Sequence, residues 1–418
     1  MAKSNSNPFA LVIEPGKPAP ALPAWVPPPG YFADVPMLNN PQDVTPAMYQ
    51  KSPSDSGVMS SPFIMWGGSA VLRDYSDLGA QVYYSGGHEA SPSYPNAQFT
   101  LICDFSTLRW STSNVPAKPN LANSFVDGYA TDGTPYTPHT YLGLQEMPKA
   151  WGGGKQGTLV SFFWAGSLFD NKINLIDVSK AVHGYSQLKT TQKDNADPTK
   201  IRFQRTSVGG SYPISVQDPA RQGWWVAVNG GVHYTLFVHK SGEITQHTAL
   251  GGNLANGALV LCNKLNLLIA VDGGYITGAG HRTLHIRNLV TGAVTKSTTL
   301  GTVPSLSGGY DGKPLTFHRP DVMGLQWVDE LGYIVGIDAT VSPPQIVKLA
   351  PPASNPATGQ WTWSTITSLQ HWSRDTGGQR ELQASVNAIW SKFRWVPALK
   401  SFVYGTAKDR KPQIIRLA

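Results

Sequence analysis

Short apolar segments recur along the chain, each followed by a turn rich in glycine or polar residues. One set, often ending in glycine, comprises QVYYSGG from Gln81, TLVSFFWAG from Thr158, GWWVAVNGG from Gly223, LNLLIAVDGG from Leu265, LGYIVGIDA from Leu331 and KSFVYGTA from Lys400. After a polar turn, each is followed by a second segment: AQFTLICDF, KINLIDVSK, HYTLFVHKSG, RTLHIRNLVTG, PQIVKLA and PQIIRLA. Apolar runs of this length bounded by turn residues are typical of strands buried on both faces.

Further candidate strands complete each unit. Those that come first are SSPFIMWGG, HTYLGLQEM, YPISVQD, ALVLCNK, DVMGLQWVDE and NAIWSKFRWVPA. Four units add a fourth strand: LRWSTS, GEITQHTAL, AVTKSTTL and GQWTWSTIT. A four-stranded antiparallel unit cannot bury both faces alone, whereas six units arranged radially can. The pattern therefore predicts an all-β fold, a six-bladed β-propeller of four-stranded antiparallel blades.

The spacing of the units supports this prediction. Matching positions in the six units lie 43 to 77 residues apart, at Val82, Leu159, Trp224, Leu267, Tyr333 and Phe402. The shortest interval fits a bare four-stranded blade, and the longer ones fit blades with loop insertions. A glycine pair, as in QVYYSGG, allows positive φ where the chain turns sharply.

The last blade needs a strand from the other end of the chain. The sequence ends on IIRLA, a third strand, so FALVIE (Phe9–Glu14) or GYFADVP (Gly30–Pro36) could supply the fourth. We expect residues 1–58 to form an extended Pro-rich N-terminal arm and residues 59–418 to form the propeller. The alternative for the arm is a disordered leader.

The first unit, YSGGHEASPSYPNAQFTLICDFSTLRW, resembles a kelch motif, in which a strand ending in a glycine pair leads through a tyrosine to a second strand and a tryptophan. The end of the chain, KFRWVPALKSFVYGTAKDRKPQIIRLA, is similar to the last blade of galactose-oxidase-like kelch propellers. The resemblance implies the propeller fold and no particular activity. It does not extend to the copper site of galactose oxidase, because no Tyr-x-x-His motif is present and neither cysteine has an evident tyrosine partner. We expect no cofactor and no metal.

Composition and charge agree with a β-rich protein and leave its partner open. Only 14% of the residues are charged, whereas the chain has 42 Gly, 33 Pro and 13 Trp. The net charge is +7, and seven basic residues against one acid lie between Lys392 and Arg416, including Lys408, Arg410 and Lys411. This cluster could contact an acidic surface, or it could be a solvated strand face. Cys103 and Cys262 lie inside apolar runs, which predicts buried free thiols.

Several residues are candidates for chemistry, each with a structural alternative. His88 and Glu89 follow the first glycine pair, and His318 and Arg319 lie in a polar loop. Six aspartates could pair for glycoside chemistry, although aspartate is also favoured in turns because it caps backbone N–H groups; they are Asp74, Asp77, Asp132, Asp218, Asp272 and Asp338. We interpret the Gly-Gly-His-Glu loop as a hinge and expect no enzyme activity.

Two functions remain open. The first is a structural or docking protein, a virion component such as a tail hub or nozzle of a short-tailed bacteriophage, made in the cytoplasm without a signal peptide. It would contact other subunits, or copies of itself, through the N-terminal arm and the basic last blade. The second is a carbohydrate-binding or carbohydrate-active kelch propeller, in which Tyr94, Tyr136, Trp151 and Tyr310 would stack on sugar rings. A third hypothesis is a cytoplasmic kelch adaptor protein. We expect no membrane contact and no sequence-specific reading of nucleic acid.

Overall fold

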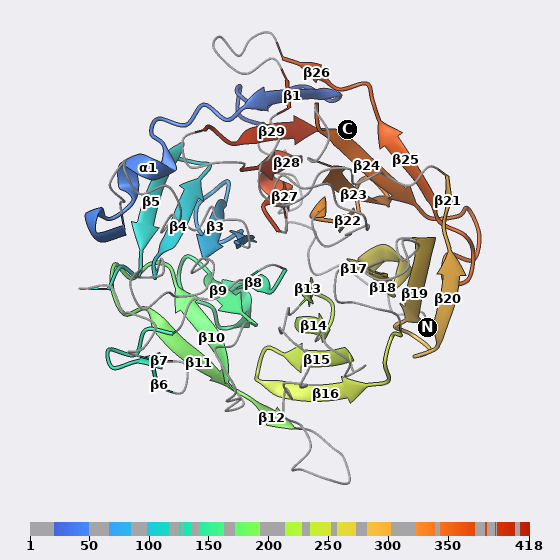
Figure 1. Cartoon of the computed structure of the whole chain (residues 1–418), viewed down its shortest axis with the longest axis horizontal. Helices are drawn as coiled ribbons and strands as arrows, with labels where there is room; N and C mark the ends of the chain where they lie inside the picture. The colour runs from blue at the N-terminus through green and yellow to red at the C-terminus, as the bar shows by residue number, and fades with distance from the viewer. Residues whose placement is uncertain are drawn as a thin grey trace.

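The computed structural model of the chain shows six antiparallel sheets arranged radially around one axis (Figure 1). This confirms the predicted all-β, six-bladed β-propeller. The described residues are 21–49, 67–84, 98–116, 125–126, 129–135, 140, 142–162, 172–192, 214–227, 235–251, 257–272, 282–301, 323–338, 343–372, 381–382, 389, 391–405 and 410–418.

The first three blades follow one another along the chain, and their strands run from the axis outward. Blade 1 contains β2 (Gly68–Leu72), β3 (Ala80–Tyr84), β4 (Thr100–Asp104) and β5 (Arg109–Ser113). Blade 2 contains β8 (Leu144–Met147), β9 (Thr158–Ser161), β10 (Lys172–Asp177) and β11 (Tyr185–Lys189). Blade 3 contains β13 (Ile214–Asp218), β14 (Gly223–Ala227), β15 (Thr235–His239) and β16 (Glu243–His247).

The remaining blades repeat the arrangement. Blade 4 contains β17 (Ala258–Cys262), β18 (Leu267–Val271), β19 (Thr283–Asn288) and β20 (Val294–Thr298). Blade 5 contains β22 (Gln326–Val328), β23 (Tyr333–Asp338), β24 (Gln345–Ala350) and β25 (Thr362–Ile366). Blade 6 contains β27 (Phe393–Val396), β28 (Ser401–Tyr404), β29 (Gln413–Arg416) and β1 (Tyr31–Asp34). A separate hairpin joins β6 (Phe125–Val126) and β7 (Tyr129–Ala130).

The ring closes through β1, from the N-terminal part of the chain. Tyr31 to Asp34 pair antiparallel with β29, near the C-terminus. The segment GYFADVP is therefore the closing strand, and FALVIE, which lies outside the described residues, is not needed for that role. On the other side of β1 lies β26 (Gln370–His371), in parallel. Similar short parallel strands, β12 (Thr191–Gln192) and β21 (Leu300–Gly301), extend blades 3 and 5.

Two strand predictions needed correction. The segment SSPFIMWGG predicted the innermost strand of blade 1, but β2 begins at Gly68, the last residue of that segment. The short side chains of Gly68 and Ser69 hid this strand from a pattern based on apolar runs. In blade 2 the strand β11 was not predicted, because its side chains are mostly polar and only partly buried.

The hydrophobic core is divided between the blades. The described residues form six apolar clusters, and each cluster fills the space between two neighbouring blades. In β18, Leu267, Ile269 and Val271 pack against blade 5, whereas Leu268 and Ala270 pack against blade 3. Both faces of the strand are therefore buried, as predicted, and each fully buried aliphatic side chain contributes about 1.5–3 kcal/mol. Cys103 and Cys262 are buried free thiols in different blades, which confirms that prediction.

The two innermost strands are joined by four residues in blades 3 to 6 and by longer loops in blades 1 and 2. The residue just before the second strand has a positive φ in all six blades: Gly79 (76°), Gly157 (78°), Gln222 (54°), Asn266 (51°), Gly332 (72°) and Lys400 (47°). The glycine pairs noted in the sequence lie at the other end of this strand, outside the described residues. The position with positive φ before the second strand is therefore glycine in only three of the six blades.

Residues 21–49 pack on the ring, although the sequence predicted an extended arm there. Asn39 exchanges two hydrogen bonds with the backbone of Trp110 in β5, at 2.8 and 3.0 Å. The short helix α1 (Pro41–Val44) and a single 3₁₀ turn (Ala47–Tyr49) follow. Trp25, Val26 and Tyr49 join the apolar cluster between blades 6 and 1. In the described ranges, no helix is long and apolar enough to cross a membrane.

Candidate functional site

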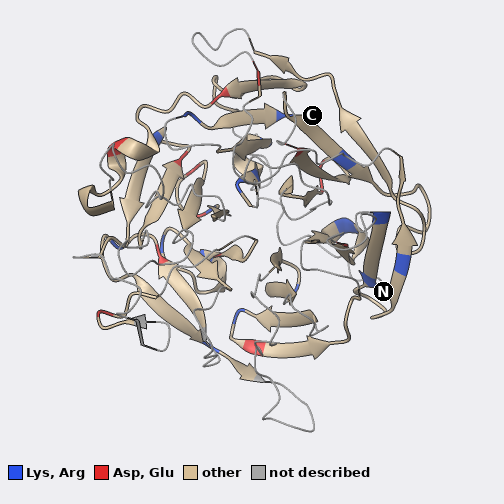
Figure 2. Ribbon diagram, viewed as in Figure 1, with Lys and Arg blue, Asp and Glu red and all other residues tan. Residues whose placement is uncertain are grey.

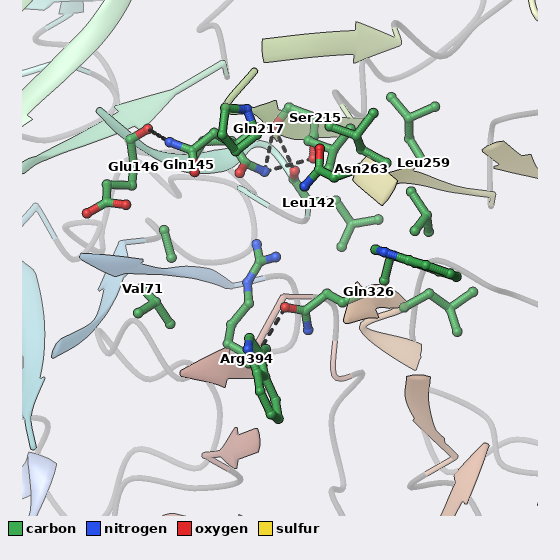
Figure 3. A pocket seen from close by; sticks show the side chains of 18 of the residues that line it. Val71, Leu142, Gln145, Glu146, Ser215, Gln217, Leu259, Asn263, Gln326 and Arg394 are labelled. Carbon is green, nitrogen blue, oxygen red and sulfur yellow. Dashed lines mark hydrogen bonds between the residues drawn. The ribbon is translucent and has the colours of Figure 1, made fainter. Parts of the chain in front are cut away.

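The candidate site is the channel on the propeller axis (Figure 3). Its cavity of about 220 Å³ is lined by the innermost strands of all six blades. Pro219, Asn263 and Pro397, from the turns that follow three of these strands, also border it. Because the six strands have the same register relative to their turns, their residues can be compared position by position.

The wall of this channel differs from blade to blade. Blade 4 contributes only aliphatic side chains from its strand: Ala258, Leu259, Val260 and Leu261. Blades 2 and 3 contribute Gln145, Glu146, Ser215 and Gln217, and blade 6 contributes Arg394 and Trp395. The strand of blade 4 is thus apolar where it lines the channel, whereas blades 2, 3, 5 and 6 contribute amides, hydroxyls or charges.

Side chains at one position in the strands connect three of the blades to the next. The Gln145 amide of blade 2 donates to the Ser215 carbonyl of blade 3 at 2.7 Å. The Gln326 amide of blade 5 donates to the Phe393 carbonyl of blade 6 at 2.6 Å. At the same position in blade 6, the Arg394 guanidinium donates to the Ser69 carbonyl of blade 1 at 2.9 and 3.1 Å. These bonds fix neighbouring innermost strands relative to one another.

An ion pair between the partly exposed Arg73 and the buried Glu146 borders the channel. Arg73, in the turn after β2, donates from Nε to Glu146 Oε2 at 2.6 Å, and its backbone N–H donates to Oε1. Gln217 links to both partners, accepting from Arg73 Nη2 and donating to the Glu146 carbonyl. Burial raises the pKa of the Glu146 carboxyl, and the Arg73 charge opposes this shift. The carboxylate is thus held in a pair between blades 1 and 2.

A buried lysine precedes the innermost strand of blade 6. Lys392 is only 1% exposed, and burial lowers the pKa of its amine to about 7. The backbone around it is held by polar contacts: Gln81 donates to the Lys392 carbonyl at 2.9 Å, and the Ser69 N–H donates to the Ser391 hydroxyl at 2.8 Å. Burial also lowers the pKa of Arg394, to about 10.

The basic cluster of the last blade therefore divides into two groups. Lys400, Arg410 and Lys411 are exposed, in agreement with a solvated surface. Arg394 instead lines the channel, and Lys392 is buried just before the same strand, so neither belongs to the solvated strand face that the sequence offered as one interpretation. In Figure 2 the ring is mostly tan because charges are sparse, and blue segments lie in several blades.

Most of the binding residues predicted from sequence lie outside the described residues: His88, Glu89, Tyr94, Tyr136, Tyr310, His318, Arg319 and Lys408. Trp151 is described and is 6% exposed. Its ring packs edge-on against Trp224, with the ring centroids 5.5 Å apart, so core packing occupies the face that was expected to stack on a sugar. Arg410 and Lys411 lie just before β29, away from the residues that line the channel.

Three of the six candidate aspartates accept hydrogen bonds from backbone N–H groups, which is the structural alternative given above. Asp74 accepts from the Lys149 N–H, and Asp132 accepts from the Thr134 N–H. Asp218 accepts from the Arg221 N–H, pairs with the Arg221 guanidinium at 2.9 Å and accepts from the Trp225 indole. Among the described residues, no group of three His, Cys, Asp or Glu side chains could hold a metal ion.

Sequence reasoning did not select the channel residues Arg73, Gln145, Glu146, Gln326 and Arg394. One signal was available: in NAIWSKFRWVPA, charged residues stand at alternate positions of a segment already assigned as an innermost strand. Since alternate residues of a strand share a face, Lys392 and Arg394 could have been placed on one side of it. Arg394 lines the channel only because the other five blades complete the ring around it.

Comparisons with known proteins do not assign the chain to a family. No protein-family model matches the chain, and no curated protein matches its sequence. Among solved structures, the chain is similar to a protein of unknown function from Bacteroides thetaiotaomicron, with 13% identity and a TM-score of 0.32 over 68% of this chain and 58% of that one. It thus spans little more than half of that protein's length.

Two further structures show similarity at the same level. A chain of the Mitotic Checkpoint Complex has 10% identity and a TM-score of 0.37, over 88% of this chain and 95% of that one. Kuenenia stuttgartiensis hydrazine synthase has 12% identity and a TM-score of 0.36, over 85% and 77%. At these values the similarities carry no information about function.

Proposed function

We propose that this protein is a non-enzymatic propeller that docks onto other protein subunits, as a structural component of a virion such as the tail hub or nozzle of a short-tailed bacteriophage. The observation that supports docking is the arrangement of residues 21–49. This segment closes the ring through β1 and then covers the outer edge of blade 1. It also presents apolar side chains to solvent, with Leu38 63% and Met48 38% exposed.

Such side chains are suited to contact another subunit. Apolar residues at the centre of an interface contribute most when they become fully desolvated. The ring behind them is rigid, because β1 is paired on both sides, so little conformational freedom would be lost on binding. The hydrogen bonds of Asp74, Asp132 and Asp218 with turn groups support a non-enzymatic role, since these carboxylates already have structural partners.

The test begins with fractionation of the native source by sedimentation, with the protein followed by mass spectrometry. We expect it to travel with large particles in fixed proportion to capsid-like proteins. Recovery only as free protein, inside or outside cells, would contradict the virion role and would make glycan binding the next function to examine.

A substitution then tests the docking surface. Leu38→Asp is expected to reduce incorporation into particles about tenfold or more, because a charge at an interface centre costs at least 1.4 kcal/mol. Val182→Asp, on the exposed turn of blade 2 where Val182 is 50% exposed, is the matched control and should leave incorporation unchanged. Equal incorporation of the two variants would show that the surface around Leu38 does not dock.

A further inference from the structure

Arg394 carries a charge that the fold does not require. The five residues at the same position in the other blades are neutral: Ala70, Gln145, Val216, Val260 and Gln326. Two of these, Gln145 and Gln326, make the same hydrogen bond to the next blade with an amide. A glutamine would therefore serve to join blade 6 to blade 1, and the positive charge of Arg394 is additional.

This charge has no acidic partner among the described residues. The guanidinium bonds only to carbonyl groups there, those of Ser69 and, at 3.4 Å, Leu144. The nearby carboxylate of Glu146 is already paired with Arg73. In the described part of the chain Nη1 has no hydrogen-bond partner, so its two N–H groups remain available. A guanidinium in this setting favours a carboxylate, which matches its planar donors.

The space in front of Arg394 is suited to a small ligand. Figure 3 shows the guanidinium pointing into the channel, toward the side where Gln145 and Gln217 lie. The cavity of about 220 Å³ is smaller than the pockets of roughly 300–1,000 Å³ that hold drug-sized ligands. Part of its wall is apolar, with Val216, Leu259 and Trp327 among its residues. One uncompensated positive charge matches a monoanion better than a dianion.

We propose that the channel binds a small organic monocarboxylate, whose carboxylate pairs with the Arg394 guanidinium and whose apolar body lies against blades 4 and 5. The observation that carries this proposal is a charged residue with an unused donor group in a partly apolar cavity, at a position where a neutral residue suffices for the fold. It is independent of the docking surface on the N-terminal segment.

Calorimetric titration of the full chain with benzoate tests the proposal, with benzamide as the neutral probe of the same shape. We expect benzoate to bind, and benzamide to bind at least tenfold more weakly. The Arg394→Gln variant should lower benzoate affinity by roughly thirtyfold or more, as expected when one partner of a buried charge pair is removed. Arg221→Gln, which removes an arginine already paired with Asp218, is the control and should bind benzoate like the wild type.

A second variant guards against misfolding of the first. Arg394→Lys keeps a positive charge at this position but loses the planar donors that match a carboxylate. It should bind benzoate more weakly than the wild type and more tightly than Arg394→Gln, and melting temperatures measured for both variants show that they are folded. Absence of benzoate binding by the wild type, equal binding of benzamide, or unchanged affinity in both Arg394→Gln and Arg394→Lys would overturn the proposal.

Discussion

Blades 4 and 6 place different residues at matched positions of their innermost strands. Blade 4 has Ala258 and Val260, whereas blade 6 has Lys392 and Arg394. Both blades complete the same four-stranded sheet and fill the same kind of apolar cluster on either side. The fold therefore accepts aliphatic residues at these positions, and the buried Lys392 and the partly buried Arg394 of blade 6 need another explanation.

The two blades also differ in how they obtain their outermost strand. In blade 4 all four strands are consecutive in the chain, and β20 follows β19 through a short turn. In blade 6 the fourth strand, β1, comes from the N-terminal part of the chain and lies between β29 and β26. Blade 6 thus holds the two ends of the propeller together. Because of this role, we expect a substitution in the outermost strand of blade 6 to destabilise the protein more than one in blade 4.

The largest expected effect comes from breaking this closure. Phe32 in β1 is 4% exposed and packs edge-on against His371. Phe32→Asp removes this packing and buries a charge, so we expect the free energy of unfolding to fall by about 3–5 kcal/mol. Lys296→Asp, on the exposed face of β20, should change it by less than about 1 kcal/mol. Urea unfolding of both variants measures the difference.

A loss of similar size in the two variants would contradict the special role of β1. If instead Phe32→Asp unfolds only the edge of blade 6, hydrogen exchange should show lost protection in β29 while blades 2 to 4 keep theirs. That result would place the last step of ring closure outside the cooperative unit of folding.

A smaller effect is expected from the buried cation Lys392. Its pKa is lowered to about 7 in the folded protein, from about 10.5 in the unfolded chain. Between these values the unfolded chain binds a proton that the folded protein does not, so stability should rise with pH. Relative to Lys392→Met, the wild type should gain about 1.4 kcal/mol per pH unit above pH 7.

Urea unfolding at pH 6, 7, 8 and 9 tests this slope. Below pH 7 the difference between wild type and Lys392→Met should be constant, because both states of the wild type then carry the proton. Lys296→Met, which removes an exposed amine from blade 4, is the control and should show a flat difference. A flat difference for Lys392→Met as well would show that the amine keeps its ordinary pKa in the folded protein.

Blades 4 and 6 also differ in how well their strands could be predicted from the sequence. The strands of blade 4 were predicted because ALVLCNK and LNLLIAVDGG carry their own signal, with apolar side chains that fill both neighbouring interfaces. The blade count followed from repetition of such segments. The closing strand could be narrowed to two segments, but not to one, because pairing of β1 with β29 depends on contacts nearly four hundred residues apart in the chain.

The channel residues were harder to predict for a physical reason. Lys392 and Arg394 look like the exposed side of a strand, since charged residues are seldom buried. The position of Arg394 depends on the other blades: Ser69 and Leu144, which accept from Arg394, belong to blades 1 and 2. The hinge interpretation of Gly-Gly-His-Glu stays a prediction, because that loop lies outside the described residues.

The smallest expected effect concerns the four-residue turn between the two innermost strands of blades 4 and 6. Asn266 in blade 4 and Lys400 in blade 6 occupy the same left-handed position, with φ of 51° and 47°. This conformation costs an ordinary side chain about 1–2 kcal/mol, whereas asparagine tolerates it better. Glycine removes the strain but adds flexibility to the unfolded chain, at about 0.5–1 kcal/mol. Lys400→Gly should therefore raise the free energy of unfolding by about 0.5–1 kcal/mol, and Asn266→Gly should leave it nearly unchanged. Thermal and urea unfolding of the two variants would measure this, and a larger gain from Asn266→Gly would show that the turn of blade 4, not that of blade 6, is the strained one.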